Sequence, residues 1–230
     1  MLKHINPDLI FENRTEAGKK LAEKLLESCC DKALLQNPIV VALPRGGVPV
    51  AKPISDLLHA KLNIMVSKKI GAPFNPELAI GAVTSQGDYV IASYFLDMLN
   101  EANSRDEKKW DYIQEQIVHL IKDCQEKEKK YCGGRDTLSE RLYCNHDVII
   151  VDDGIATGMT IMAGIKSIKK QNPRNIILAA PVISHEAFEE LKEQVNKIEF
   201  LKIPQDFIAV GIHYLSFEQV SDEDIKALMN

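Results

Sequence analysis

The stretch from Val148 to Thr160 constrains the fold of this chain more than any other. It begins with four β-branched residues, continues with Asp152 and Asp153, and then becomes a loop of small residues. A short β-branched run is typical of a strand buried on both faces of a parallel sheet. Because the apolar residues after the loop follow helical spacing, the stretch predicts a strand, an acidic pair, a tight turn and the start of a helix.

The loop after the acidic pair has the chemistry of an anion site. Its small side chains leave backbone N–H groups exposed, and the dipole of the following helix favours a negative charge. The hydroxyls of Thr157 and Thr160 add donors, whereas Asp152 and Asp153 can only accept and suit the hydroxyls of a sugar. These residue types point to a phosphorylated ribose. The alternative is a hairpin turn at Asp153-Gly154, which would need a second strand where the sequence has helical spacing.

The stretch resembles the phosphoribosyl pyrophosphate (PRPP) signature of the type I phosphoribosyltransferases, in which two acidic residues precede Gly-x-Ala-Thr-Gly-x-Thr. It lacks the Gly-Lys-Ser/Thr ending of a P-loop, and the chain has no Gly-x-Gly-x-x-Gly motif. The resemblance implies that Asp152 and Asp153 hold the ribose hydroxyls. It also implies that the loop binds the 5-phosphate of PRPP. The loop residues are Gly154, Ile155, Ala156, Thr157, Gly158, Met159 and Thr160.

A second strand, glycine loop and helix lie earlier in the chain. Pro38 to Leu43 reads as a buried strand, and Arg45, Gly46 and Gly47 follow in a sharp loop. Successive glycines can present N–H groups to an anion, and Arg45 adds a forked cation. Taken alone, the loop could also be a plain turn. A similar loop binds the pyrophosphate of PRPP in the type I phosphoribosyltransferases, and the resemblance implies that role for Arg45, Gly46 and Gly47.

A third run extends the resemblance. We expect a strand from Leu62 to Ser67 that points Lys68 and Lys69 toward the ligand crevice of the sheet, although both could be solvated surface charges. With Pro-Arg-Gly-Gly-Val-Pro-Val-Ala before it and Gly-Ala-Pro-Phe-Asn-Pro-Glu-Leu-Ala-Ile-Gly-Ala-Val after it, the run resembles a bacterial subfamily of uncharacterised phosphoribosyltransferases. The resemblance implies that Lys69, and Lys68 in place of an arginine, bind pyrophosphate. Glu77 is a further candidate for contact with magnesium or substrate.

A helical insertion is predicted at about residues 92–135. Apolar residues at helical spacing, among them Trp110 and Ile117, lie amid charged ones and indicate a long amphipathic helix. Its apolar stripe would be a core contact or a dimer seam. The glycines beyond it and Arg135 either end the helix or, as the resemblance implies, form the hinge of a closing loop that brings a cation to the pyrophosphate.

The C-terminal segment at about residues 204–230 begins with an aromatic, irregular part at residues 204–217. Ser221 with Asp224 can then form a capping box at the start of a last short helix. The superfamily resemblance implies a small hood, built from terminal segments, that holds the acceptor base. Phe207, Tyr214 and Phe217 are candidates to stack on its ring, with packing of a small subdomain as the alternative. A tryptophan is usual in the subfamily where this chain has His213. This difference leaves the acceptor preference open.

Alternating strands and helices predict one α/β domain over residues 1–230, with a mainly parallel, doubly wound sheet. The net charge of −5 gives no reason to expect a nucleic-acid or membrane-surface partner. The amino terminus lacks the apolar core of a signal peptide and no run approaches a membrane span, so we expect a cytoplasmic location. Five cysteines without a zinc-binding spacing are expected to be free thiols.

Together these features predict a magnesium-dependent phosphoribosyltransferase of nucleotide metabolism. A nitrogen of a nucleobase or similar heterocycle would attack C1 of PRPP and displace pyrophosphate. Asp152 and Asp153 would face the developing positive charge, and Arg45, Lys69 and Mg²⁺ would neutralise the leaving group. PRPP would supply most of the ligands of Mg²⁺, with Asp152, Asp153 and Glu77 as candidate protein ligands. A PRPP-sensing regulator without chemistry is the alternative function, and a homodimer is possible.

Overall fold

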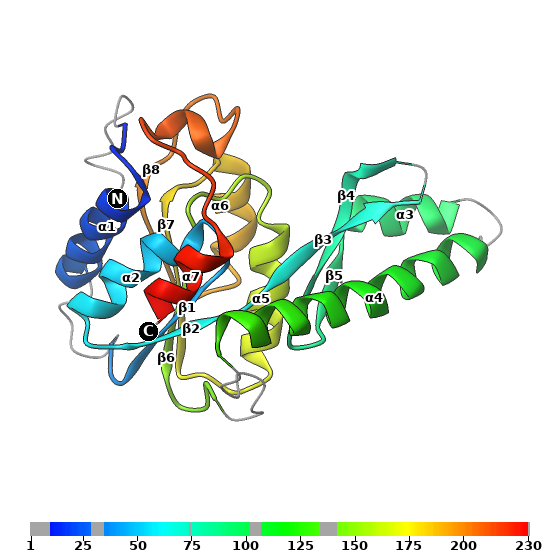
Figure 1. Ribbon diagram of the computed structural model, residues 1–230. Helices are drawn as coiled ribbons and strands as arrows, with labels where there is room; N and C mark the ends of the chain where they lie inside the picture. The colour runs from blue at the N-terminus through cyan, green and yellow to red at the C-terminus, as the bar shows by residue number, and fades with distance from the viewer. Residues whose placement is uncertain (1–9, 29–34, 74, 102–106, 134–141, 230) are drawn as a thin grey trace.

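The computed structural model describes residues 10–28, 35–73, 75–101, 107–133 and 142–229. Its body is a sheet of five parallel strands in the order β2-β1-β6-β7-β8 (Figure 1). Buried, largely apolar residues form the three central strands, as expected for a sheet covered on both faces. The strands are β1 (Pro38–Ala42), β2 (Lys61–Ile64), β6 (Asp147–Val151), β7 (Asn175–Val182) and β8 (Lys197–Lys202).

Helices cover both faces of this sheet. Alternate residues of β6 point to opposite sides, with Ile149 and Val151 in one core cluster and Val148 and Ile150 in the other. The first cluster includes residues of α1 (Arg14–Ser28), α2 (Gly47–Leu57) and α7 (Asp222–Met229). The second includes residues of α5 (Met159–Lys169) and α6 (His185–Leu191). The predicted doubly wound α/β fold is therefore confirmed.

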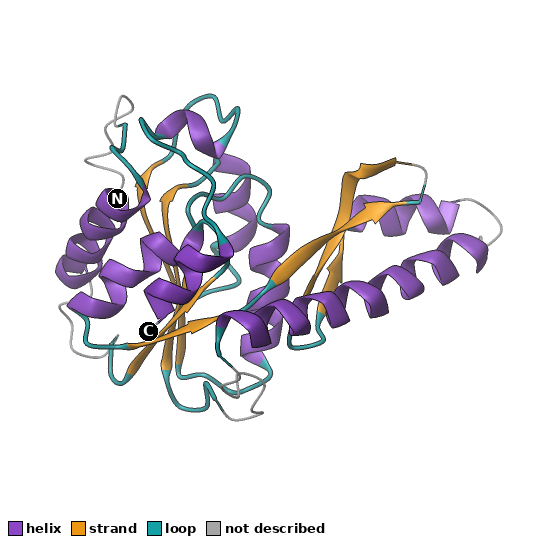
Figure 2. Ribbon diagram, viewed as in Figure 1, coloured by secondary structure: helices purple, strands orange, loops and turns teal. Residues whose placement is uncertain are grey.

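An arm extends away from the body (Figures 1 and 2). It contains an antiparallel sheet of β3 (Ser67–Ala72), β4 (Asn75–Thr84) and β5 (Tyr89–Ile91), followed by α3 (Ser93–Glu101) and α4 (Glu107–Tyr131). The two helices fall in the predicted insertion, but the antiparallel sheet was not predicted from the sequence. The strand predicted from Leu62 to Ser67 was wrong in its bounds, because β2 ends at Ile64 and β3 begins at Ser67. Met65 and Val66, which lie between the two strands, are apolar and buried. No turn residue in the sequence therefore marks the point where the chain changes sheets.

Polar contacts fasten the arm to the body. The buried Glu128 carboxylate of α4 accepts hydrogen bonds from the Val66 N–H, at 2.9 Å, and from the Ser85 hydroxyl. A second buried contact joins β4 of the arm to α5 of the body, where the hydroxyls of Thr84 and Ser167 lie 2.8 Å apart. We call residues 152–158 the acidic loop, and α5, the helix that follows it, therefore also supports the base of the arm.

The two terminal segments meet above the carboxyl ends of the central strands. Phe11 pairs with Tyr214 in a β-bridge, just after the short 3-10 helix η1 (Val210–His213). The Phe11 N–H donates to the His213 carbonyl at 2.9 Å, and the Leu215 N–H donates to the Phe11 carbonyl at 2.8 Å. We call residues 204–221 the hood segment.

The last helix starts as its sequence predicts. At the start of α7, the Ser221 hydroxyl donates to the Asp224 carboxylate at 2.7 Å and accepts from the Asp224 N–H at 3.1 Å. Within the residues described, no helix combines the length and apolar character required to cross a membrane.

Candidate active site

Two of the predicted ligand loops lie side by side at one edge of the body sheet. β1 and β6 are neighbours in parallel register, with Ala42 opposite Val151. The loop after β1 and the loop after β6 therefore emerge together, and the Leu43 N–H donates to the Val151 carbonyl at 2.9 Å. This is the carboxyl edge, where open α/β sheets bind ligands.

Glycines let these loops approach closely. A Cβ at Gly47 would lie 2.6 Å from the Val151 carbonyl oxygen, and one at Gly46 would lie 1.9 Å from Oδ2 of Asp153. Neither position can hold a side chain without movement of its neighbour. The Pro44-Arg45 peptide bond in the same loop is cis. Arg45 is exposed at the loop surface.

The loop of residues 154–158 ends at the start of α5. Gly158 precedes the helix with φ of 70°, a left-handed conformation that favours glycine. Glycine has no side chain to cap a helix, so the first N–H groups of α5 suit an anion. The loop is bonded to the end of β7 and to the segment that joins β7 and α6. The Ile155 N–H donates to the Val182 carbonyl at 2.9 Å, and Ser184 Oγ donates to the Ala156 carbonyl at 2.6 Å.

The residues of this loop differ in exposure. Ala156 and Thr157 are exposed, Ile155 is buried, and Met159 and Thr160 in the first turn of α5 are half-buried. Backbone groups and the Thr157 side chain are therefore the parts of the loop most open to a ligand.

Two adjacent carboxylates stand between the loops. The Asp153 N–H donates to Oδ1 of Asp152 at 2.9 Å, and Oδ2 of Asp153 accepts from Nε of Arg14 at 2.7 Å. Loss of solvation and then the charge of Asp153 raise the pKa of Asp152 well above its ordinary value, while the charge of Arg14 opposes this rise. The raised pKa reflects two carboxyl groups held close together away from water, and a cation that develops beside them would be stabilised.

Arg14 is a further residue of the candidate site, and its place there was not predicted from the sequence. It is the first residue of α1, directly after the Asn13 cap, and 139 residues separate it from Asp153. Its guanidinium lies 3.7 Å from the centroid of the Phe217 ring, and Nη1 donates to the Glu218 carbonyl at 2.7 Å. Asn13 with Glu16 three residues later is a capping pattern that marks the helix start in the sequence, but nothing there pairs Arg14 with Asp153.

The hood segment packs on the same loop. The buried Tyr214 donates its hydroxyl to the Asp153 carbonyl at 2.6 Å, and burial raises the pKa of Tyr214. A Cβ at Gly154 would lie 2.5 Å from Cγ1 of Val210, which shows how closely the two segments approach. The ring of Tyr214 packs on Phe11, and the half-buried Phe207 joins that cluster. Phe217 is exposed and covers Arg14.

The remaining predicted site residues lie on or near the arm. Lys68 and Lys69 are in β3 rather than at the end of a parallel strand. Lys68 forms an ion pair with Asp123 of α4 at 2.6 Å, and Lys69 is exposed. Glu77 is exposed near the β3–β4 turn. Their proposed ligand roles stay predictions.

The end of α4 lies near the glycine loop. Asp222 accepts hydrogen bonds from Lys130 at 2.7 Å and from the Tyr131 hydroxyl at 2.8 Å. These bonds and the more distant charge of Arg45 lower the pKa of Asp222. Gly133 of the predicted hinge is the last described residue of this segment and has φ of 59°, whereas Gly134 and Arg135 lie outside the described residues.

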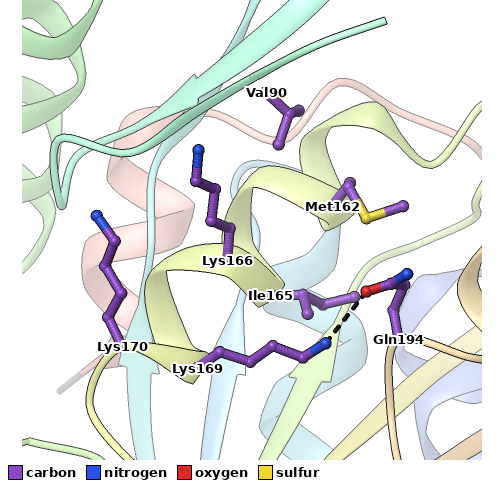
Figure 3. Close-up of a pocket in the computed structure, with 7 residues that line it drawn as sticks. All are labelled: Val90, Met162, Ile165, Lys166, Lys169, Lys170 and Gln194. Atoms are coloured by element: carbon purple, nitrogen blue, oxygen red, sulfur yellow. Dashed lines mark hydrogen bonds between the residues drawn. The ribbon is translucent and has the colours of Figure 1, made fainter. Parts of the chain in front are cut away.

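A separate hollow of about 460 Å³ lies between the arm and the side of α5 (Figure 3). It is lined by Val90, Met162, Ile165, Lys166, Lys169, Lys170 and Gln194. Each of its lysines has a partner: Lys166 donates to the Tyr89 carbonyl at 2.8 Å, Lys169 donates to Gln194 at 3.1 Å, and Lys170 pairs with Asp88. The bonds of Lys166 and Lys170 attach the arm to α5, and no residue of the acidic loop lines the hollow.

The fold and the paired loops define a doubly wound α/β protein with an anion site at the carboxyl edge of its sheet. Residues 12–215 match the family model of the phosphoribosyl transferase domain. The chain therefore belongs to this family.

Individual proteins also resemble this chain in sequence or in structure. The crystal structure of TT1426 from Thermus thermophilus is 36% identical, covers 96% of this chain and 97% of that chain, and superposes with a TM-score of 0.76. AQ2163 from Aquifex aeolicus shares only the fold, with 13% identity over 94% of this chain and 84% of that chain, and a TM-score of 0.50. A Mycobacterium tuberculosis H37Rv protein, provisionally named a phosphoribosyl transferase, is 32% identical over 222 residues, which are 96% of this chain and 46% of that protein. The chain thus spans about half the length of this mycobacterial relative.

Proposed function

We propose that the protein transfers the 5-phosphoribosyl group of PRPP to a nitrogen of a small heterocyclic acceptor, such as a nucleobase, and releases pyrophosphate. The observation that carries this proposal is the close contact of the two loops, in which Gly47 packs on the Val151 carbonyl beside Asp152 and Asp153. One loop suits a phosphorylated ribose and the other suits a second anion, so their proximity suits a ligand with both groups.

The reaction needs no covalent intermediate with the protein. As the bond between C1 and the pyrophosphate oxygen breaks, positive charge develops on the ribose and negative charge on the leaving group. Asp152 and Asp153 hold the ribose hydroxyls and stabilise the cation, while the start of α5 anchors the 5-phosphate. Arg45 and the N–H groups of its glycine loop bind pyrophosphate. The acceptor nitrogen supplies the electron pair of the new bond to C1.

Magnesium is the cofactor that we propose for this site. The described residues contain no cluster of three or more histidine, cysteine or acidic side chains suited to a metal. A pair of carboxylates without such a cluster fits Mg²⁺, which commonly binds one or two carboxylates together with substrate phosphates. Asp152 and Asp153 are the residues that would hold it. When bound, Mg²⁺ would neutralise charge on the pyrophosphate.

Substitution of the acidic pair tests this function. We expect Asp152→Asn and Asp153→Asn each to weaken binding of PRPP with Mg²⁺ by about 10- to 100-fold, because each loses a charged acceptor for a ribose hydroxyl. Isothermal titration calorimetry measures the affinity. Asp56→Asn, which changes an exposed carboxylate on α2, is the matched control and should bind as the wild type does. Unchanged affinity in both site variants would contradict the assignment.

A further inference from the structure

Arg14 joins three parts of the candidate site. Its Nε bonds Asp153 in the acidic loop, its Nη1 bonds the Glu218 carbonyl in the hood segment, and its guanidinium lies on the Phe217 ring. The glycine loop is also close, because a Cβ at Gly46 would lie 3.1 Å from Nε of Arg14.

The contact is sheltered and geometrically specific. The side chains of Arg14 and Asp153 are only 12% and 15% exposed, so water competes little for the ion pair. A guanidinium is planar and directs its N–H groups along fixed directions, and it can stack on an aromatic ring at the same time. Arg14 bonds Asp153 and the Glu218 carbonyl and stacks on Phe217 at the same time. A lysine amine at this position could not make all three contacts.

A second cation on the same helix shows how this differs from ordinary packing. Lys24 of α1 also lies over an aromatic ring, with Nζ 5.0 Å from the centroid of Phe200, and it bonds the Phe200 carbonyl. Both contacts of Lys24 are with a residue of β8, away from the acidic loop. Arg14 adds the bond to Asp153, which is the residue proposed to hold the ribose.

We propose that Arg14 is a positioning residue, which fixes the Asp153 carboxylate for the ribose and ties the hood segment to the acidic loop. This role rests on the proposed function. It means that occupation of the ribose site and the placement of the hood over the acceptor are coupled through one side chain. Arg14 acts through the geometry of its fork and not through its charge alone.

Binding of PRPP with Mg²⁺ to variants of this contact tests the role of the fork. We expect Arg14→Gln to weaken binding about tenfold, as loss of a partly buried charge-assisted bond would. Arg14→Lys should remain nearly as weak, because charge alone does not restore both bonds. Phe217→Leu should weaken binding to a smaller extent, and Arg14→Gln combined with Phe217→Leu should be no weaker than Arg14→Gln alone. Lys24→Gln is the control and should bind as the wild type does.

Hydrogen–deuterium exchange of the ligand-free protein tests the same contact without PRPP. Exchange over residues 207–217 should be faster in Arg14→Gln than in the wild type, while β6 and β7 stay protected and show that the body is folded. Lys24→Gln should leave exchange of the hood segment unchanged. Unchanged exchange of the hood in Arg14→Gln would overturn the proposal.

The binding results can also overturn it. Tighter binding in Arg14→Gln would mean that Arg14 blocks Asp153 and must leave before PRPP enters. Wild-type affinity in Arg14→Lys would mean that charge alone suffices. If the wild type itself does not bind PRPP, the proposed function fails, and the exchange measurement still decides whether Arg14 holds the hood to the acidic loop.

Discussion

At the scale of single residues, Gly46 and Gly47 set how closely the two ligand loops approach. Gly46 has φ of −65°, which any residue can adopt, so its backbone does not require glycine. What requires glycine is the neighbouring carboxylate, because a Cβ there would lie 1.9 Å from Oδ2 of Asp153. The constraint at this position therefore comes from the site and not from the turn.

Gly46→Ala should consequently impair the ligand site more than the fold. We expect the Asp153 carboxylate to move and the affinity for PRPP with Mg²⁺ to fall about tenfold or more, since small displacements of site groups are costly. The control is Gly164→Ala on α5, whose Cβ would lie 3.6 Å from the Met65 sulfur in ordinary contact. Calorimetry and thermal unfolding of both variants check this expectation, and wild-type affinity in Gly46→Ala would contradict it.

At the scale of elements, Asp147 connects the starts of β6 and β7 with the segment before β1. Its fully buried carboxylate accepts from Nε of Arg174 at 2.9 Å, from Asn175 Nδ2 at 2.8 Å and from the Gln36 N–H at 2.7 Å. Burial opposes ionisation, but the bonds from Arg174, Asn175 and Gln36 outweigh it and lower the pKa of Asp147. These contacts lie at the amino edge of the sheet, opposite the ligand loops.

The lowered pKa predicts a loss of stability in acid. Because Asp147 binds its proton less readily when folded than when unfolded, its stabilisation is present at neutral pH and is lost as pH falls from about 4 through the folded pKa. We expect Asp147→Asn to reduce the free energy of unfolding by about 3 kcal/mol at pH 7. The free energy of unfolding of the variant should also fall less steeply than that of the wild type as the pH is lowered in acid. Urea unfolding across pH checks both, and parallel pH profiles for variant and wild type would refute the role of Asp147.

The elements also show what the sequence could and could not predict. The apolar runs of β1, β6 and β7 are buried on both faces, so their local pattern identifies them and the loops that follow. The run after β2 continues through buried Met65 and Val66 into a different sheet, and no turn residue marks the change. The predicted position of the two lysines of β3, at the end of a parallel strand, was wrong for this reason. Arg14 reaches Asp153 only through the tertiary fold, which local patterns do not encode.

At the scale of the whole molecule, three parts converge on one edge of the sheet. The body supplies the acidic loop and the glycine loop, the terminal segments supply the hood, and the end of α4 reaches the vicinity of Arg45 through Tyr131 and Asp222. The arm is attached to α5, the helix that begins at the proposed phosphate loop. The proposed ligand site and the arm therefore share α5.

Acceptor-dependent release of pyrophosphate tests the proposed activity most directly. The wild-type protein would be supplied with Mg²⁺, PRPP and a panel of nucleobases and related heterocycles, and pyrophosphate would be measured by a coupled assay. We expect at least one acceptor to cause release, and we expect Asp153→Asn to abolish most of it. Failure to bind PRPP, or binding without release for any acceptor of the panel, would contradict the proposed transferase.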